Sequence, residues 1–423
     1  MGNLVVVQFE MLQTVPPANP DDASPDDGPE VSFEEAPAEL MAERDGVDVT
    51  SYRLPPRPPI LKHPIKAFFW FVRAGFGIAS LILLLAVIAA IPVVNFLALG
   101  YLLEVEGRVA RTGKLRNAFL LLDVAPRFGA ITLGIWLWVI PLRLLATMRG
   151  DVTFLDPGGN AERFLNAFSP FLATLVAGHL CLALARGGSL SCFFRPIKNI
   201  RWLMKRWHSG DYMSHATAGV QDILLRLRLR HHFWLGVRGF AGAMIWLVIP
   251  TALFASARPD NGGTILLSII GGLGLVVVFS WLPFLQARFA MTGEWRDMFD
   301  RCAIKQLYRR TPLAWFLAIA TVYVMALPLY LPKVYLLPSD AMWLVTIVFI
   351  VTIYPARVLT GWVVYRATHR ETEPWFGWRW LSRTLTVPLL ALYVFLLFFT
   401  PLIGEHGKRI LFEHHALLLP VPF

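Results

Sequence analysis

Apolar residues occur along this chain in eight long, continuous runs separated by polar and charged connections. The runs cover residues 75–103, 128–147, 164–185, 233–256, 264–286, 312–332, 341–364 and 385–404. Most of them match the roughly 20 residues that a helix needs to cross a hydrocarbon core of about 30 Å. A membrane β-barrel would instead need short segments of alternating hydrophobicity. The pattern therefore predicts an all-α integral membrane protein with about eight apolar helical segments.

The overall composition agrees with this class. The 423 residues are 56% hydrophobic and only 16% charged, with a mean hydropathy of +0.55. Soluble domains usually contain about 25% charged residues. A water-soluble globular protein is therefore excluded.

The first 59 residues differ sharply from the rest of the chain. They are rich in Pro and Ala, and they contain three Arg against twelve Asp or Glu, a net charge of −9. Such a segment cannot bury enough apolar surface to offset its ordering entropy. Residues 1–59 are therefore predicted to be a disordered acidic tail, while residues 60–423 have a net charge of +19.

Positive residues in the connections predict the orientation. The connections after segments 1, 3, 5 and 7 contain 24 Lys or Arg, whereas those after segments 2, 4 and 6 contain four. Lys and Arg favour the cytoplasmic side in short loops. The basic connections are therefore expected to face the cytoplasm of a cell inner membrane, and residues 405–423 are expected to form an external tail.

The first segment leaves two alternatives open. A single helix kinked at Pro92 would place the N-terminus outside. A broken, re-entrant hairpin would keep it inside, provided that protein covers the turn. Several Lys and Arg just before the segment favour the second alternative.

A twelve-residue stretch occurs twice. Residues 108–119 and 288–299 have six identical positions at an offset of 180, among them a Thr-Gly pair. The match predicts two tandem four-segment units, 60–256 with a basic cytoplasmic insertion at 186–232, and 257–404. Units with an even number of spans would be parallel, related by an axis along the membrane normal. Chance similarity between apolar sequences is the alternative.

Charged residues in the apolar segments are few. Arg357 lies deep in segment 7, just after Pro355, and a helix broken at that proline would leave backbone carbonyls free near the cation. Arg357 is therefore a candidate anion or lipid-headgroup contact. No Asp or Glu falls in a segment core, and Glu104 and Glu106 are expected at the interface, where Arg238 or Arg288 are candidate partners.

A second candidate lipid contact lies in the basic insertion. Residues 195–207 alternate apolar and basic positions at helical spacing, which predicts an amphipathic interfacial helix. Its basic candidates are Lys198, Arg201, Lys205 and Arg206. Anionic membrane lipids are the predicted partner, because the rest of the chain is too apolar for a nucleic-acid-binding protein. An ordinary positive-inside loop is the alternative.

Signatures of catalysis or metal binding are weak. Gly107–Leu115 has the wrong spacing for a phosphate-binding loop, and the common hydrolase and dinucleotide motifs are absent. His208, Asp211 and His215 have helical spacing but are interrupted by Gly210, and Glu413-His414-His415 stands alone. The sequence therefore predicts neither an enzyme nor a bound cofactor or metal.

One short stretch carries a family resemblance. Gly100-Tyr101-Leu102-Leu103, followed by Arg108 and Gly113, resembles an uncharacterised family of prokaryotic multi-pass membrane proteins, in which such a helix end leads into a basic stretch. The equivalent stretch of the second unit reads Pro283-Phe284-Leu285-Gln286 and departs from the pattern. The resemblance implies a membrane location and no catalytic residues.

Three functions remain open at this stage. The first is a non-catalytic scaffold or lipid-interacting protein that uses its basic cytoplasmic face. The second is a transporter or channel in which broken segments 1, 5 and 7 line a site near Arg357. The third, a membrane enzyme acting on lipids, lacks the clustered nucleophile and base that it would need.

Overall fold

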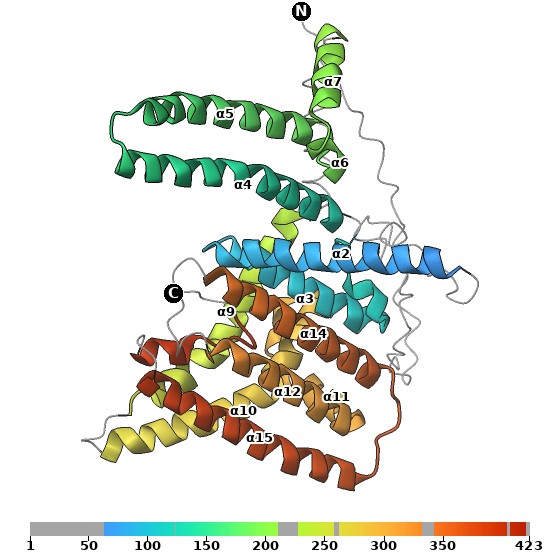
Figure 1. Ribbon diagram of the computed structural model, residues 1–423. Helices are drawn as coiled ribbons and strands as arrows, with labels where there is room; N and C mark the ends of the chain where they lie inside the picture. Colours follow the sequence, from blue (N-terminus) through green and yellow to red (C-terminus); the bar gives the residue numbers. More distant parts are fainter. Residues whose placement is uncertain are drawn as a thin grey trace, which may run out of the picture. The chain divides into compact units, whose positions relative to one another are not determined.

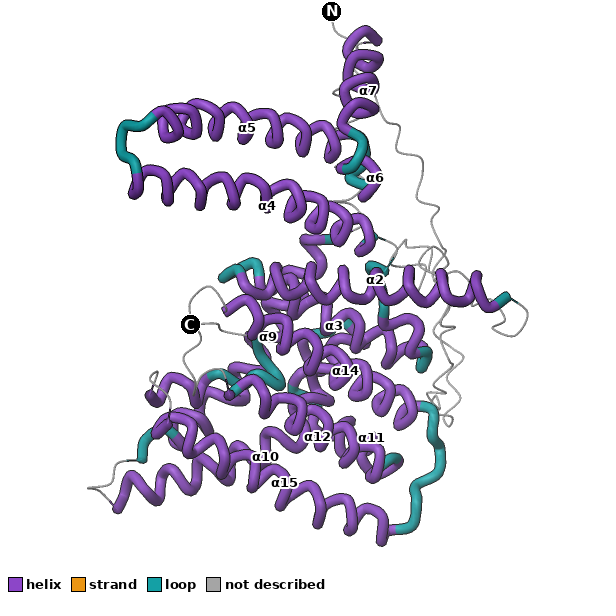
Figure 2. The backbone as a smooth tube through the Cα atoms, in the orientation of Figure 1, coloured by secondary structure: helices purple, strands orange, loops and turns teal. Residues whose placement is uncertain are grey.

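The computed structural model describes residues 63–122, 124–209, 227–257, 262–331, 342–403 and 407–419. The chain divides into two units, Met1–Ser51 and Tyr52–Phe423, and every described residue belongs to the second. The tail predicted at 1–59 lies outside the described residues. Every regular element of the described part is helical, which confirms the all-α class (Figure 2).

Eight of the described helices are long and apolar enough to cross a membrane. They are α2 (Pro64–Ala90), α4 (Ala125–Leu155), α5 (Asn160–Ala185), α9 (Leu229–Phe254), α10 (Gly262–Thr292), α12 (Pro312–Ala326, continued by the turn η4, Leu327–Leu329), α14 (Met342–Thr368) and α15 (Phe376–Ile403) (Figure 1). Each contains most or all of one predicted segment. The protein is a multi-pass helical membrane protein.

Shorter elements connect or cap these helices. They are α3 (Asn95–Thr112), η2 (Leu115–Ala118), α6 (Leu190–Phe193), α7 (Pro196–Ser209), η3 (Trp295–Met298), α11 (Arg301–Arg310) and η6 (Gly407–Phe412).

The first apolar segment is divided between α2 and α3. The helix stops at residues 91–94, where Pro92 is followed by Val93 with a φ of 69°. The chain then reverses direction. Leu122, which follows α3 in the chain, packs against the middle of α2, where its side chain would lie 3.0 Å from a Cβ added to Gly77. The structure thus contains a hairpin rather than one kinked helix. Its two arms are longer than the sequence predicted, since α2 begins at residue 64 and α3 continues to residue 112.

Helix α3 lies at the centre of the bundle. It packs against α9, α10, α14 and α2, and 13 of its 18 residues are buried. Close packing depends on small residues. A Cβ on Gly100 would collide with the carbonyl of His232 in α9, and one on Gly107 would collide with the carbonyl of Ala290 in α10.

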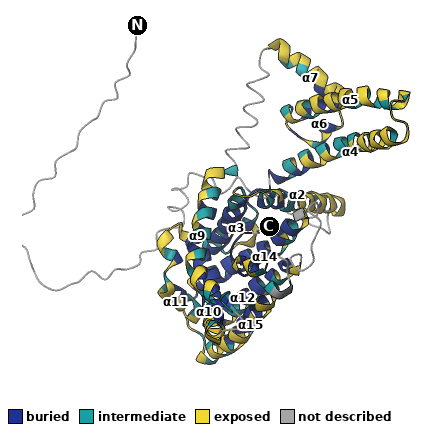
Figure 3. Ribbon diagram, turned by 90° about the vertical axis from the view of Figure 1, so that its left-hand side faces the viewer, coloured by how far each residue is buried: buried dark blue, intermediate teal, exposed yellow. Residues whose placement is uncertain are grey.

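Helices α4 and α5 form a second hairpin with a different environment. Only four of the 31 residues of α4 and three of the 26 residues of α5 are buried. Figure 3 shows both helices largely exposed, whereas α3 and α14 are mostly buried. The hairpin contacts the rest of the bundle mainly through α2, where Gly129 lies against Ser80.

The duplicated stretch has the same local structure in both copies. Helices α3 and α10 end at Thr112 and Thr292, each followed by a left-handed glycine, with φ of 66° at Gly113 and 77° at Gly293. A 3-10 turn then begins two residues later in each copy. In both copies the threonine hydroxyl donates to the carbonyl four residues before it. The extent of the two predicted four-segment units stays a prediction.

Candidate functional site

A buried polar cluster surrounds Arg357 in the middle of the bundle. Its side chain is 3% exposed, and its Nη1 lies 2.9 Å from Oε2 of Glu106 on α3. The same Nη1 donates to Oε1 of Gln286 on α10, also at 2.9 Å. The guanidinium is therefore neutralised inside the protein, and the partner that the structure gives it is an internal carboxylate. Contact of Arg357 with an external anion or headgroup stays a prediction.

The two partners of Arg357 occupy equivalent positions of the duplicated elements. Glu106 and Gln286 are 180 residues apart, the same offset that relates the two copies of the repeat. The copies also touch directly, since Arg111 Nη1 donates to the carbonyl of Met291, its own equivalent, at 2.7 Å. The ends of α3 and α10 thus lie side by side, and Arg357 on α14 bridges them.

The chain after α15 folds back into this region. Residues 413–419 are buried, and the carbonyl of Leu417 accepts hydrogen bonds from Gln286 Nε2 at 3.0 Å and Arg357 Nη2 at 3.1 Å. The sequence predicts an external tail over 405–423. In this C-terminal segment, residues 407–419, positions 410, 411 and 413–419 are buried and Lys408, Arg409 and Phe412 are exposed, and the side of the membrane on which the segment lies stays a prediction.

Two other expectations near this cluster are wrong. Glu106 is fully buried, and its partner is Arg357 rather than Arg238 or Arg288. Arg288 instead pairs with Asp297 and Asp300 beyond the end of α10. Helix α14 also continues through Pro355, so the carbonyls near Arg357 come from the C-terminal segment and not from a broken helix.

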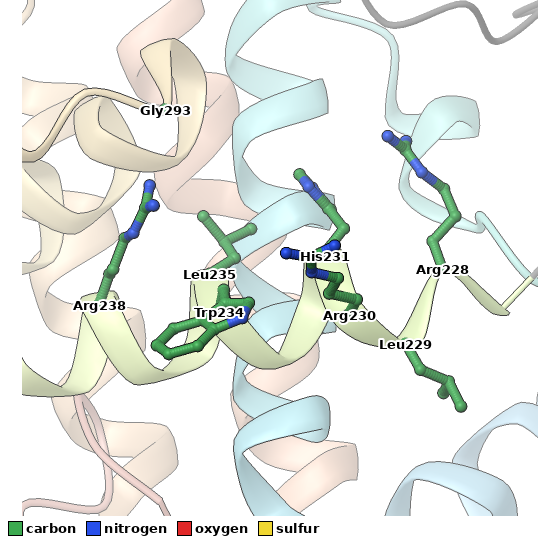
Figure 4. Close-up of a pocket in the computed structure, with 8 residues that line it drawn as sticks. All are labelled: Arg228, Leu229, Arg230, His231, Trp234, Leu235, Arg238 and Gly293. Carbon is green, nitrogen blue, oxygen red and sulfur yellow. The ribbon is translucent and has the colours of Figure 1, made fainter.

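A basic cavity of about 820 Å³ lies at the start of α9 (Figure 4). Four of its lining residues are basic: Arg228, Arg230, His231 and Arg238. Trp234 and Leu235 add apolar walls, and Gly293, the left-handed glycine that follows α10, closes one side. The first turn of α9 contains no acidic residue. Because a helix N-terminus is itself the positive end of the helix dipole, the cations here are not offset by their own helix.

Among the described residues, the carboxylate that contacts a residue of this cavity is that of Glu104, which has three basic partners. Its Oε1 pairs with Arg108 at 2.9 Å and Arg111 at 3.3 Å, and its Oε2 lies 3.2 Å from Nε2 of His231. Among the described residues, Arg228, Arg230 and Arg238 have no ion pair with a carboxylate. Within the described residues, these three arginines therefore have no carboxylate counter-ion.

The predicted amphipathic helix is α7. Its basic candidates Lys198, Arg201 and Lys205 are exposed, and Arg206 is half-exposed. The apolar side chains between them are also exposed: Ile197, Ile200, Met204 and Trp207. Only Asn199 is buried, where it accepts from Arg186 and donates to the carbonyl of Cys192. Helix α7 packs on α5 and α6, so the structure does not bring its basic residues to Arg357.

Comparison with protein-family models, curated proteins and solved structures found no match. The family resemblance of the Gly-Tyr-Leu-Leu stretch is therefore neither supported nor contradicted by them. Within the fold this stretch lies in the buried part of α3, where Gly100 permits the close approach of α9.

The structure describes only part of the two histidine clusters that the sequence offered as metal-binding candidates. Asp211 and His215 lie outside the described residues. His414 is buried in the C-terminal segment, beyond the last spanning helix, and its Nε2 lies 2.8 Å from the hydroxyl of Thr251. Burial lowers the pKa of His414 to about 3. The neutral form is therefore the one that fits this site.

Sequence reasoning missed the basic cavity and the Glu106–Arg357 pair. The cations of the cavity come from the N-cap and the first three turns of α9, and each has the sequence context of an ordinary interfacial residue. The ion pair had a usable signal. Polar residues at 106 and 286 occupy the same position relative to the two copies of the repeat, which indicates a shared partner.

Proposed function

We propose that this protein is a non-catalytic, lipid-interacting protein of the cell inner membrane, which binds anionic lipid headgroups at the basic cavity of α9. The observation that carries the proposal is the gathering of Arg228, Arg230, His231 and Arg238 around one cavity with apolar walls. A phosphate group would occupy the cationic part, and Trp234 and Leu235 would contact the glycerol and upper acyl region.

The charge balance supports an anionic ligand. Glu104 already pairs with Arg108, Arg111 and His231, so it cannot also neutralise the arginines of the cavity. Lys and Arg near an anionic membrane surface each contribute about 1 kcal/mol to attraction.

Helix α7 supports the same role. Trp207 and its neighbouring apolar side chains are exposed beside basic residues, which is the pattern of a helix lying at a membrane interface. Both α7 and the start of α9 belong to the connection with the most Lys and Arg, which favours the cytoplasmic side. The α2–α3 hairpin is consistent with this orientation, because it returns the chain to the side from which it entered.

The test is a lipid-binding titration of the full chain in nanodiscs with a fluorescent anionic phospholipid. The triple variant Arg228→Gln, Arg230→Gln, Arg238→Gln should bind at least about tenfold more weakly, given the contribution of each cation. The matched control is Arg143→Gln, Arg149→Gln, Arg163→Gln, which removes the same charge from exposed positions on α4 and α5. Equal affinity of the two variants would contradict the proposal.

Transport is a second candidate, and one observation favours it. Glu106 is a buried carboxylate at the centre of the bundle, and such residues often mark substrate or ion pathways. The sequence contained no carboxylate in a predicted segment core, so this support comes from the fold. Against it, of the three segments expected to be broken only segment 1 is, because α10 and α14 are continuous helices in the described part of the chain. Loss of a substrate-dependent flux in Arg357→Gln, with the protein still folded, would favour transport.

A further inference from the structure

A second cavity, of about 360 Å³, lies where the start of α12, the end of α14 and the start of α15 meet. Residues 311–314, at the first turn of α12, form part of its wall. The wall also contains two cations and two indole rings: Arg366, Arg370, Trp362 and Trp378. Because three helices that are long and apolar enough to cross a membrane begin or end here, this α12 cavity lies at the level where a membrane meets water.

Thr311 brings to the α12 cavity a hydroxyl group that the fold does not use. The residue is 3% exposed, and its Oγ1 is buried without a hydrogen-bond partner among the described residues. Thr311 is the N-cap of α12, where a threonine hydroxyl normally accepts from an N–H of the first turn, but this bond is absent. Buried polar groups are nearly always paired. The hydroxyl is therefore available to a ligand, both as a donor and as an acceptor.

The first turn of α12 adds main-chain donors at the same place. The first bond back to the N-cap runs from the N–H of Trp315 to the carbonyl of Thr311, at 3.0 Å. The N–H groups of Leu313 and Ala314 come before it, and no main-chain partner for them lies in the part of the chain that the structure describes. A helix N-terminus is also the positive end of the helix dipole, and the two effects together favour an anion.

Two arginines supply full positive charges. Arg366 lies in the last turn of α14, and its guanidinium carbon is 5.4 Å from the centroid of the Trp362 ring. Stacking on an aromatic face orients a guanidinium and leaves its N–H groups free for the oxygens of a phosphate. Arg370 follows two residues after α14. Neither arginine forms an ion pair with a described carboxylate, and the neighbouring Glu373 pairs with Arg379 instead.

We propose that the α12 cavity is a phosphate-binding site, in which Thr311 and the first-turn N–H groups of α12 are the hydrogen-bond donors and Arg366 and Arg370 balance the charge. A phosphate offers several acceptor oxygens on one anion, which matches this set of donors. The phosphate belongs to a membrane phospholipid or is free in solution. The site shares no residue with the basic cavity of α9, so it does not rest on the lipid-binding proposal.

Hydrogen exchange of residues 311–317 in the full chain tests the site locally, because a bound phosphate would protect the N–H groups of Leu313 and Ala314. One arm compares phosphatidylcholine nanodiscs with and without phosphatidic acid. The other adds inorganic phosphate to pure phosphatidylcholine nanodiscs, with the ionic strength held constant by chloride. Saturable slowing of exchange in the first arm identifies a lipid phosphate, and saturable slowing in the second identifies free phosphate. No saturable slowing in either arm would overturn the proposal.

The hydroxyl of Thr311 gives the sharpest variant. Thr311→Val keeps nearly the same shape but removes the hydroxyl, so the midpoint concentration for protection should increase by about tenfold or more. Thr311→Ser keeps the hydroxyl and should bind like the natural chain. Because Oγ1 has no partner in the fold, Val should not lower the melting temperature, which separates lost binding from lost structure. Equal midpoints for the Val and Ser variants would overturn the role of the hydroxyl.

The arginines are tested as a pair. Arg366→Gln with Arg370→Gln should raise the midpoint at least about tenfold. The matched control, Arg143→Gln with Arg149→Gln, removes the same charge from exposed positions of α4 and should leave the midpoint unchanged. Equal midpoints for the two pairs would show that overall charge, and not the α12 cavity, attracts the phosphate. The variant of Arg228, Arg230 and Arg238 should keep the protection of residues 311–317, which separates this site from the basic cavity.

Discussion

Helix α3 and the α4–α5 hairpin show opposite relations between hydrophobicity and burial. Helix α3 contains two Glu and two Arg, yet 13 of its 18 residues are buried. Helices α4 and α5 are apolar enough to cross a membrane, yet only 17% of the most apolar stretch of each is buried. In a bilayer the solvent for the outer surface is lipid, so apolar character marks exposure to lipid. Polar and small residues mark the helix that lies inside.

The largest expected effect comes from removing the charge on the central helix. Glu106→Gln leaves Arg357 buried without a counterion, and breaking such a pair costs about 3–5 kcal/mol. Glu162→Gln in the hairpin, where the carboxylate is far more accessible, should cost less than about 1 kcal/mol. Denaturant unfolding of both variants in detergent measures the difference.

The equivalence of positions 106 and 286 in the repeat gives a second test of the ion pair with Arg357. Glu106 and Gln286 contact the same nitrogen of Arg357, so the double exchange Glu106→Gln with Gln286→Glu restores one carboxylate beside the cation. The double variant should therefore be more stable than either single variant. Additive destabilisation would contradict the shared role of the two positions.

Glycine substitutions are expected to have the next largest effect. A Cβ on Gly107 would collide with the carbonyl of Ala290, so Gly107→Ala should destabilise the protein by about 1–3 kcal/mol. Nothing lies within 4 Å of a Cβ on Gly178 in α5, where Ala should be neutral or slightly stabilising. Thermal unfolding in one detergent compares the pair, and equal melting temperatures would refute the central position of α3.

Acid is expected to weaken the attachment of the C-terminal segment to the central helices. The pKa of His414 is about 3 in the folded protein and about 6.5 when free, so the free segment binds a proton at a higher pH. The contribution of neutral His414 to the free energy of unfolding is complete above about pH 6.5. It falls by up to about 1.4 kcal/mol per pH unit as the pH decreases toward 3. Hydrogen exchange of residues 410–419 between pH 8 and 5 measures it, and His414→Gln should show a smaller dependence on pH.

The smallest effect is expected inside the hairpin. Trp138 Nε1 on α4 and His179 Nε2 on α5 both lie 2.9 Å from the carbonyl of Phe193. Trp138→Phe removes one hydrogen bond and should cost about 1 kcal/mol, confined to the hairpin. Hydrogen exchange should increase in α4 to α6 and not in α3. An increase in α3 would show that the two regions are more closely coupled than the structure indicates.

The eight membrane segments could be predicted from the sequence, because length and hydropathy are sufficient for that. Helix α3 could only be predicted in part. Its charged second half, from Glu104 to Arg111, falls outside any apolar run, although six of these eight residues are buried. The hairpin at residues 91–94 was one of two alternatives, and Pro92 with the basic residues before segment 1 was the signal for it.

The sites were harder to predict than the fold. Arg357 was identified because it is a lone charge in an apolar segment, but its partner lies 251 residues away and depends on how three helices pack. The C-terminal segment mixes apolar residues with Lys408, Arg409, Glu413 and two His, and nothing local indicates that it packs into the core. The basic residues of α7 were found because helical periodicity is a local property.

Photo-crosslinking to lipid tests the lipid-binding proposal most directly. Trp234 in the basic cavity and Trp136 on α4 are similarly exposed, at 52% and 58%, and each is replaced in turn by a photoreactive phenylalanine in the full chain. In nanodiscs with equal amounts of anionic and zwitterionic phospholipid, the account predicts strong enrichment of anionic lipid at position 234 and none at position 136. The same lipid ratio at both positions would contradict it.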